Sequence, residues 1–164
     1  MSSEIKRGMI VGKPAPSFTL QSHLGNYVNI KDEIKKSSAM LVFYPKDFTR
    51  VCTQQLCDYR DNMSQFKDYG VQIFGISNND RQSHWDFSAQ HEFPFLLLSD
   101  PFNKTAKAYE CSSVFMLGNV SRAVVLVNTK GQILYRYIEP TTLTRRKSHD
   151  LLQVIRQLRE NKLI

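Results

Sequence analysis

The feature that most constrains the fold is a continuously apolar run, AMLVFY, at positions 39–44. A run this short without a polar position is typical of a strand buried on both faces, in the middle of a sheet covered by helices. Pro45 follows at once and ends the run, because proline cannot continue a hydrogen-bonded ladder. The chain is therefore expected to have an α/β fold with a central sheet.

Further strands are expected where short apolar runs are bounded by turn residues, at 18–20, 27–30, 71–77, 93–100, 121–128 and 132–139. The first two of these form an expected N-terminal hairpin. The last two form a second hairpin, in which Gly131 suits a backbone with positive φ.

Helices are expected between these strands. From Cys52 to Phe66 the apolar residues recur at steps of four, three, four and three, which is the spacing of one helical face, and Gly70 is expected to end this helix. A second helix is expected after Asn79 or Asp80, and a short one at 103–109. The last helix is expected to bury Leu151, Leu152, Ile155 and Leu158.

One domain covering residues 1–164 is expected, because 41% of the 164 residues are apolar and no repeat or linker divides the chain. Lys and Arg number 22 and Asp and Glu 15, giving a net charge of +7, but the basic residues are scattered, so no specific nucleic-acid surface is predicted. The opening lacks the apolar core of a secretory signal and no run could span a bilayer, which predicts a cytoplasmic protein without a membrane partner. In that compartment the three cysteines are expected to be reactive or buried.

Cys52 stands at the head of the predicted helix, directly after a strand and a loop. Backbone N–H groups and the positive end of the helix dipole stabilise a thiolate there, and Arg50 adds a charge two residues away. A thiolate is the form that attacks an electrophile. Cys52 also lies on the apolar face of the helix, so its position alone equally allows a small buried hydrophobic residue.

Pro45, Thr49 and Cys52 spell P-x-x-x-T-x-x-C, which resembles the active-site motif of the peroxiredoxins. The window FYPKDFTRVCTQQLCDYRD, at 43–61, is most similar to the branch called peroxiredoxin Q or bacterioferritin comigratory protein. The likeness continues from about residue 11 to the end of the last helix. It implies a thioredoxin-like fold with a central mixed sheet, and a thiol peroxidase that uses no metal or prosthetic group.

Carried over position by position, the resemblance makes Cys52 the nucleophile that takes one oxygen from a peroxide. It implies that Thr49 hydrogen-bonds the peroxide and the thiolate, that Pro45 shields the site from water, and that Arg122 is a charge-assisted donor to both. Without the resemblance these three residues would be read as a helix cap, a strand terminator and a surface cation. Arg50 stands where the family commonly has proline, so the loop is expected to be less rigid or more positive.

Cys57 follows Cys52 by five residues and is the candidate to capture an oxidised Cys52 as a disulfide. In an intact helix the two Cα atoms lie about 8.6 Å apart, on different faces. A disulfide without backbone movement needs less than about 7 Å, so the first turns of the helix must unwind. The alternative is a buried structural cysteine. Cys111 is expected to be a bystander, the alternatives being that it resolves Cys52 or links two chains.

The resemblance implies hydrogen peroxide and organic hydroperoxides as substrates, thioredoxin or a similar dithiol protein as reductant, and a monomer or weak homodimer. Three alternatives stay open: a non-enzymatic redox sensor, a one-cysteine peroxidase resolved by an external thiol, and an oxidoreductase that exchanges disulfides. No zinc site is predicted, because the histidines form no compact pair that could join Cys52 and Cys57 as ligands. The four histidines are read as surface or loop residues, and Trp85 as a packing residue.

Overall fold

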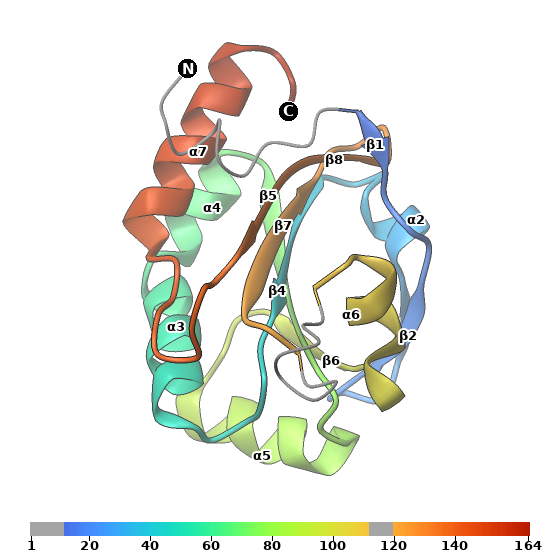
Figure 1. Cartoon of the computed structure of the whole chain (residues 1–164), viewed down its shortest axis with the longest axis vertical. Coiled ribbons are helices and arrows are strands. Elements are labelled where there is room, and N and C mark those ends of the chain that lie inside the picture. Colours follow the sequence, from blue (N-terminus) through green and yellow to red (C-terminus); the bar gives the residue numbers. More distant parts are fainter. Residues whose placement is uncertain (1–11, 112–119) are drawn as a thin grey trace.

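The computed structural model describes residues 12–111 and 120–164. The charged opening at 1–11 and the segment 112–119 after Cys111 lie outside these ranges. The described residues form one mixed sheet of eight strands in the order β1-β8-β7-β4-β5-β6-β2-β3, flanked by helices (Figure 1).

The strands are β1 (Lys13–Pro14), β2 (Thr19–Ser22), β3 (Tyr27–Asn29), β4 (Ser38–Phe43), β5 (Val71–Ser77), β6 (Leu96–Ser99), β7 (Ala123–Val127) and β8 (Gln132–Ile138). The helices are α2 (Ile30–Glu33), α3 (Arg50–Asp61), α4 (Met63–Asp68), α5 (Arg81–His91), the 3-10 turn η1 (Pro101–Asn103), α6 (Lys104–Ala108) and α7 (Ser148–Glu160).

Strand β4 lies in the middle of the sheet, and all six of its residues are buried. It pairs in parallel with β5 and antiparallel with β7. Both of its faces are covered, as its unbroken apolar sequence requires. The prediction of a central buried strand is therefore confirmed.

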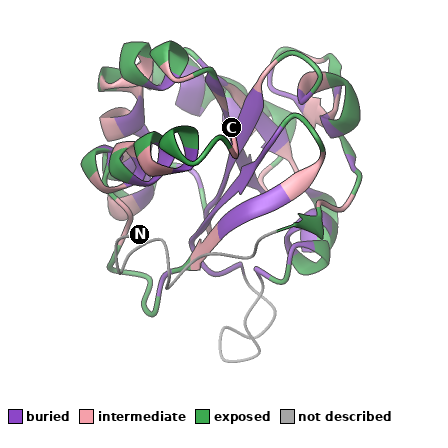
Figure 2. Cartoon of the chain, turned by 90° about the horizontal axis from the view of Figure 1, so that it is seen from above, coloured by how far each residue is buried: buried purple, intermediate pink, exposed green. Residues whose placement is uncertain are grey.

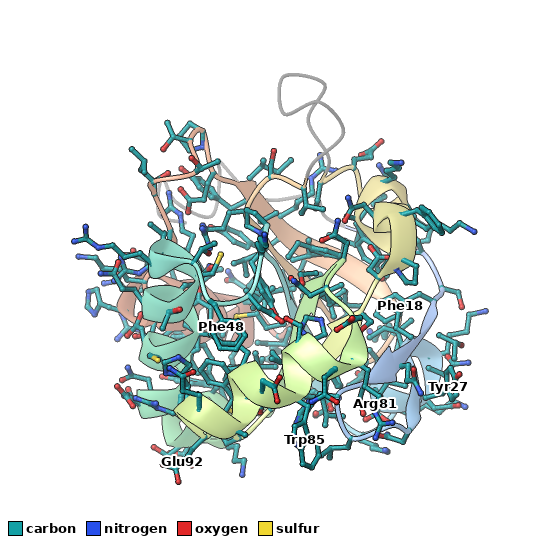
Figure 3. The ribbon with its side chains drawn as sticks, turned by 90° about the horizontal axis from the view of Figure 1, so that it is seen from below. Phe18, Tyr27, Phe48, Arg81, Trp85 and Glu92 are labelled. Atoms are coloured by element: carbon teal, nitrogen blue, oxygen red, sulfur yellow. The ribbon has the colours of Figure 1, made fainter. Side chains whose placement is uncertain are left out.

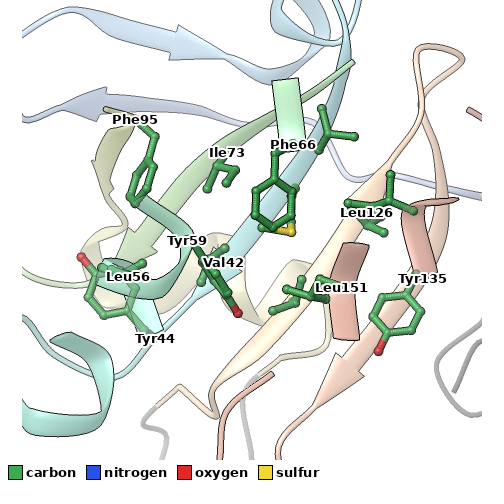
Figure 4. Packing of buried hydrophobic residues seen from close by; sticks show 14 of the residues in the cluster. Val42, Tyr44, Leu56, Tyr59, Phe66, Ile73, Phe95, Leu126, Tyr135 and Leu151 are labelled. Atoms are coloured by element: carbon green, nitrogen blue, oxygen red, sulfur yellow. The ribbon is translucent and has the colours of Figure 1, made fainter. Parts of the chain in front are cut away.

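Successive residues of β4 point to opposite faces of the sheet and so enter two separate cores. Met40 and Val42 pack in the core beneath α3, α4, α5 and α7, while Leu41 and Phe43 pack in the core on the side of α2 and α6. Figure 4 shows the first core, and Figure 2 shows that buried residues follow the sheet and the inner faces of the helices. The sheet thus separates two helical layers (Figure 1).

Both predicted hairpins are present: β2 pairs antiparallel with β3, and β7 with β8. Gly131 in the second turn has φ +76°, the left-handed conformation that glycine adopts without strain. Helix α5 begins after Asp80, whose carboxylate accepts a hydrogen bond from the backbone N–H of Ser83 across 2.8 Å. Of the two predicted caps, Asp80 is the one used.

The single helix predicted from Cys52 to Gly70 is wrong, because α3 ends at Asp61 and α4 begins at Met63. Asn62, between them, has non-helical φ −110° and ψ 15°. Its side-chain amide donates to the carbonyl of Asp58 across 2.9 Å, a local bond of the kind that competes with a helix. The apolar spacing continues across the break, so the pattern alone conceals it.

Three smaller differences concern short or amphipathic segments. Helix α7 buries Val154, while Leu152 is only partly buried. Strand β1 and helix α2 are too short for a periodic pattern and were not expected.

No helix within the described ranges combines the length and the apolar character that crossing a bilayer demands.

Candidate active site

Cys52 is the third residue of α3 and lies in the first turn, as predicted. The first intrahelical hydrogen bond runs from the N–H of Thr53 to the carbonyl of Thr49 across 2.9 Å. The N–H groups of Arg50, Val51 and Cys52 precede this bond, so the thiol lies at the positive end of the helix. Its exposed fraction is 0%.

Arg122, the residue before β7, contacts this thiol. Ala123 at the start of β7 pairs with Phe43 at the end of β4, so the residue before Ala123 lies beside the loop that follows β4. Nη1 of Arg122 donates to Sγ of Cys52 across 3.2 Å. Arg122 is 3% exposed, which rules out its reading as a surface cation.

Gln55 was not predicted as part of the site. Its Oε1 accepts from Nη1 of Arg122 across 2.8 Å, and its Nε2 donates to the hydroxyl of Tyr59 across 2.9 Å. Tyr59 donates in turn to the carbonyl of Arg146 across 2.6 Å. These three contacts hold the guanidinium against Cys52. The signal available in the sequence was a glutamine on the otherwise apolar face of the predicted helix.

A pocket of about 470 Å³ lies over this group. Three of the predicted site residues line it: Pro45, Thr49 and Arg122. The remaining lining residues are Arg50, Val51, Gln54, Thr142 and Leu143. Cys52 does not line the pocket, but its sulfur contacts Arg122, which does.

Thr49 occupies the N-cap position of α3, but its side chain makes no capping hydrogen bond. Its hydroxyl donates instead to the carbonyl of Lys46 across 2.9 Å. The hydroxyl oxygen keeps lone pairs with which it can accept a further hydrogen bond. Thr49 is exposed at the pocket, so the reading of its side chain as a simple helix cap does not hold.

The reading of the histidines as surface or loop residues is wrong for His84, which lies in α5 and is 0% exposed. His23 does lie in the turn between β2 and β3, although it is only 7% exposed. Nδ1 of His84 lies 2.8 Å from a carboxylate oxygen of Asp47, in the loop between β4 and α3. The other carboxylate oxygen accepts from the hydroxyl of Tyr44 across 2.7 Å, and Ser83 also donates to Asp47. A buried carboxylate requires hydrogen-bond partners of this kind. No motif in the sequence indicates that His84 and Ser83 meet Asp47.

The loop between β4 and α3 also makes an aromatic contact with α5. Phe48 adopts a positive φ of 62°, and its ring centroid lies 4.9 Å from that of Phe87 (Figure 3). Together with Asp47, this contact fixes the loop that carries Thr49. Trp85, also on α5, is labelled in Figure 3 and is 47% exposed. Its ring centroid lies 6.3 Å from that of His23.

The other two cysteines differ in their surroundings. Cys57 is partly buried on α3, and burial raises the pKa of its thiol from 9.0, while Arg60 lowers it and Asp61 raises it. Cys111 is buried, and burial raises its pKa to about 12. Its sulfur donates to the carbonyl of Tyr109 across 3.4 Å, in the core on the other side of the sheet from Cys52.

Residues 11–136 match the model of the AhpC/TSA family. The chain belongs to the AhpC/TSA family. Within it, the chain is 34% identical over 126 residues to peroxiredoxin Q, chloroplastic, of Oryza sativa subsp. japonica, covering 77% of this chain and 58% of the relative. It is 31% identical over 131 residues to peroxiredoxin Bcp of Bacillus subtilis strain 168, covering 76% of this chain and 82% of the relative. The expected resemblance to these AhpC/TSA members is confirmed, although the chain spans less than two thirds of the length of the first plant relatives.

Solved structures of other family members share the fold. Peroxidoxin BcpB from Mycobacterium tuberculosis superimposes with a TM-score of 0.80 at 22% identity, over 93% of this chain and 97% of that one. Xanthomonas campestris peroxiredoxin Q superimposes with a TM-score of 0.79 at 23% identity, over 91% of this chain and 97% of that one. The thioredoxin-like fold is thereby confirmed.

Proposed function

We propose that this chain is a thiol peroxidase that reduces hydrogen peroxide and organic hydroperoxides through Cys52. The observation that carries the proposal is the 3.2 Å contact between the guanidinium of Arg122 and the sulfur of Cys52, at a helix N-terminus and beneath a pocket. A guanidinium in contact with a buried sulfur is placed to stabilise negative charge as it moves between the sulfur and a bound peroxide. The curated relatives named above are peroxiredoxins, which supports the same chemistry.

In the reaction, the thiolate of Cys52 attacks one oxygen of the peroxide. The S–O bond forms as the O–O bond breaks, and the departing oxygen takes up a proton and leaves as water or an alcohol. Negative charge moves from sulfur to this oxygen, so a fixed guanidinium stabilises the transition state. Arg122 has the right place for that, because it both touches Sγ and lines the pocket.

Thr49 and Pro45 have complementary roles in this proposal. The hydroxyl hydrogen of Thr49 is committed to Lys46, so its oxygen accepts the O–H of the incoming peroxide and orients the O–O bond. The ring of Pro45 carries no donor and limits water on its side of the pocket. Because Cys52 is unexposed, the peroxide reaches the sulfur only when the pocket floor yields slightly.

Organic hydroperoxides are included because the pocket has an apolar part. Val51 and Leu143 line it beside Arg50 and Gln54, so an alkyl chain and a polar group both find contacts. Arg50, which replaces the proline common in the family, adds positive charge to the pocket wall.

Cys57 completes the cycle by forming a disulfide with the sulfenic acid of Cys52. Both cysteines lie within α3, on different turns, so the first turns of α3 unwind before the sulfurs meet. Thioredoxin or a similar dithiol protein then reduces the disulfide. The proposal includes a cytoplasmic location and a monomer or weak homodimer.

The test is one equivalent of hydrogen peroxide added to the reduced protein, followed by alkylation, intact-mass analysis and peptide mapping. We expect a disulfide between Cys52 and Cys57 within one chain, which thioredoxin then reduces over repeated cycles. Cys111→Ser is the matched control and should behave as the wild type. Oxidation of Cys52 without turnover would favour a redox sensor, and an unoxidised Cys52 would overturn the proposal.

A further inference from the structure

Cys57 faces a histidine from another helix. Sγ of Cys57 lies 3.8 Å from Nδ1 of His91, the last residue of α5 and 34 positions away in the chain. Figure 3 shows that α5 runs beneath α3 and α4 and ends, at the labelled Glu92, on their side of the molecule. The contact therefore joins the end of α5 to α3, the helix that carries Cys52.

The imidazole of His91 is held in place by aromatic rings. It stacks on Phe93, with ring centroids 5.6 Å apart and planes 24° apart, and meets Phe87 edge-on at 5.3 Å and 84°. The backbone is fixed as well, since Nη1 of Arg60 donates to the carbonyl of His91 across 2.6 Å. Arg60 lies almost one helical turn after Cys57, so it ties α3 to the end of α5 beside the thiol–imidazole contact.

The chemistry of disulfide formation requires a proton acceptor at this position. Cys57 must lose its proton before its sulfur attacks, because the thiolate is the nucleophile. Burial makes that loss harder, since it raises the pKa of the Cys57 thiol. The charged groups that act on the thiol are Arg60 and Asp61 on α3, and Glu92 after α5 acts in turn on Arg60. Arg60 favours the thiolate, Asp61 disfavours it, and neither carries the proton away.

We propose that His91 is the general base that deprotonates Cys57 for disulfide formation. The proposal rests on the peroxidase function above. Nδ1 takes the proton while α3 is still folded. The thiolate then moves to Cys52 as the first turns of α3 unwind.

The step balances as a condensation of a sulfenic acid with a thiol. The sulfur of Cys57 forms a bond to the sulfur of Cys52, and the S–O bond of the sulfenic acid breaks. The sulfur of Cys57 is oxidised and that of Cys52 reduced. The leaving hydroxide takes a proton from solvent, and the partly exposed imidazolium of His91 returns one to solvent. The net products are one disulfide and one water.

The experiment compares His91→Gln with the wild type in a rapid-quench measurement after one equivalent of hydrogen peroxide. Oxidation of Cys52, followed as sulfenic acid trapped by a dimedone probe, should proceed at the wild-type rate. Disulfide formation at pH 7 should slow about 100-fold, within the range that general bases provide. Sulfenic acid therefore accumulates in the variant. His149→Gln, which removes an exposed histidine on α7, should match the wild type in both phases.

The pH profile separates a base from a structural support. Above pH 9, Cys57 increasingly ionises without help, so the deficit of His91→Gln should shrink as the pH rises. A deficit that stays constant with pH, or wild-type disulfide formation by the variant at pH 7, would overturn the assignment while leaving the peroxidase intact. A wild type in which Cys52 forms neither sulfenic acid nor a disulfide after peroxide would overturn both proposals.

Discussion

Nη1 of Arg122 and Sγ of Cys52 lie 3.2 Å apart although 70 residues separate them in the chain. The antiparallel pairing of β4 with β7 brings them together, because it places the residue before β7 next to the loop after β4. The same nitrogen also donates to Gln55, on the turn of α3 that follows Cys52. The pairing of the two strands and the hydrogen bond to Gln55 together fix the position of the Arg122 guanidinium against Cys52.

Replacement of Arg122 by lysine should slow the oxidation of Cys52 by hydrogen peroxide. Lysine keeps the charge but cannot hold Gln55 and Cys52 in the fixed geometry of a guanidinium. We expect a loss of about 100-fold, the scale for removal of one positioned donor. The measurement is the second-order rate constant from competition with a catalase or a peroxidase. Arg156→Lys, on the exposed side of α7, is the control, and an equal loss in both variants would contradict the role of Arg122.

Replacement of Gln55 by leucine should weaken both the site and the fold. Leucine has a similar volume but leaves Arg122 and the Tyr59 hydroxyl each without one buried partner. The free energy of unfolding should fall by about 1–3 kcal/mol. Denaturant titration measures this change, and the rate of Cys52 oxidation should fall in parallel. Gln90→Ala on the exposed face of α5 should change neither quantity.

Replacement of Asp47 by alanine should destabilise the loop that carries Thr49. The side chains of Asp47 and His84 are fully buried, so removing the carboxylate takes one buried partner from His84 and one from the Tyr44 hydroxyl. The free energy of unfolding should fall by about 1–3 kcal/mol, the scale for leaving a buried polar group unsatisfied. Asp32→Ala removes an exposed pair with Lys35 and should cost less than about 1 kcal/mol. Similar losses of unfolding free energy in the two variants would show that the buried pair stabilises the fold no more than the exposed one.

Cys111 should resist alkylation in the folded protein, because it is buried and its pKa is about 12. An unfolded chain ionises this thiol near the ordinary value of 9.0. Its contribution to stability is thus complete below pH 9 and is lost as the pH rises toward 12, by at most about 1.4 kcal/mol per pH unit. Denaturant titrations at pH 8 and pH 10 should show a larger drop for the wild type than for Cys111→Ala. Equal drops would argue against a thiol kept protonated by the fold.

Oxidation should expose the backbone of the first turns of α3. Cys52 and Cys57 cannot form a disulfide while both remain helical, so the amides of residues 52–60 should exchange faster in the oxidised protein. Hydrogen exchange read by mass spectrometry measures this, with β4 as an internal reference that should not change. Equal protection of residues 52–60 in the two redox states would rule out unwinding.

Local patterns in the sequence were enough to predict most of the elements. The unbroken apolar run of β4, the two hairpins and the head of α3 follow from period, length and turn residues, which act over a few neighbours. The motif linking Pro45, Thr49 and Cys52 is local as well. It was sufficient to indicate the family, and Cys52 does lie in the first turn of the helix.

Long-range pairing decided what surrounds that thiol. Gln55, His84 and His91 become part of the site only because α3 packs against β7 and α5, and no short pattern encodes which helices meet. The break between α3 and α4 at Asn62 could not be predicted from apolar spacing either, because that spacing continues through it. A hydrogen bond from the side chain of Asn62 to the carbonyl of Asp58 accompanies the break. The sequence by itself determined the candidate nucleophile, the start of its helix and the fold class of the chain. Only the tertiary structure decided its partners, because burial and hydrogen bonding depend on contacts between segments far apart in the chain.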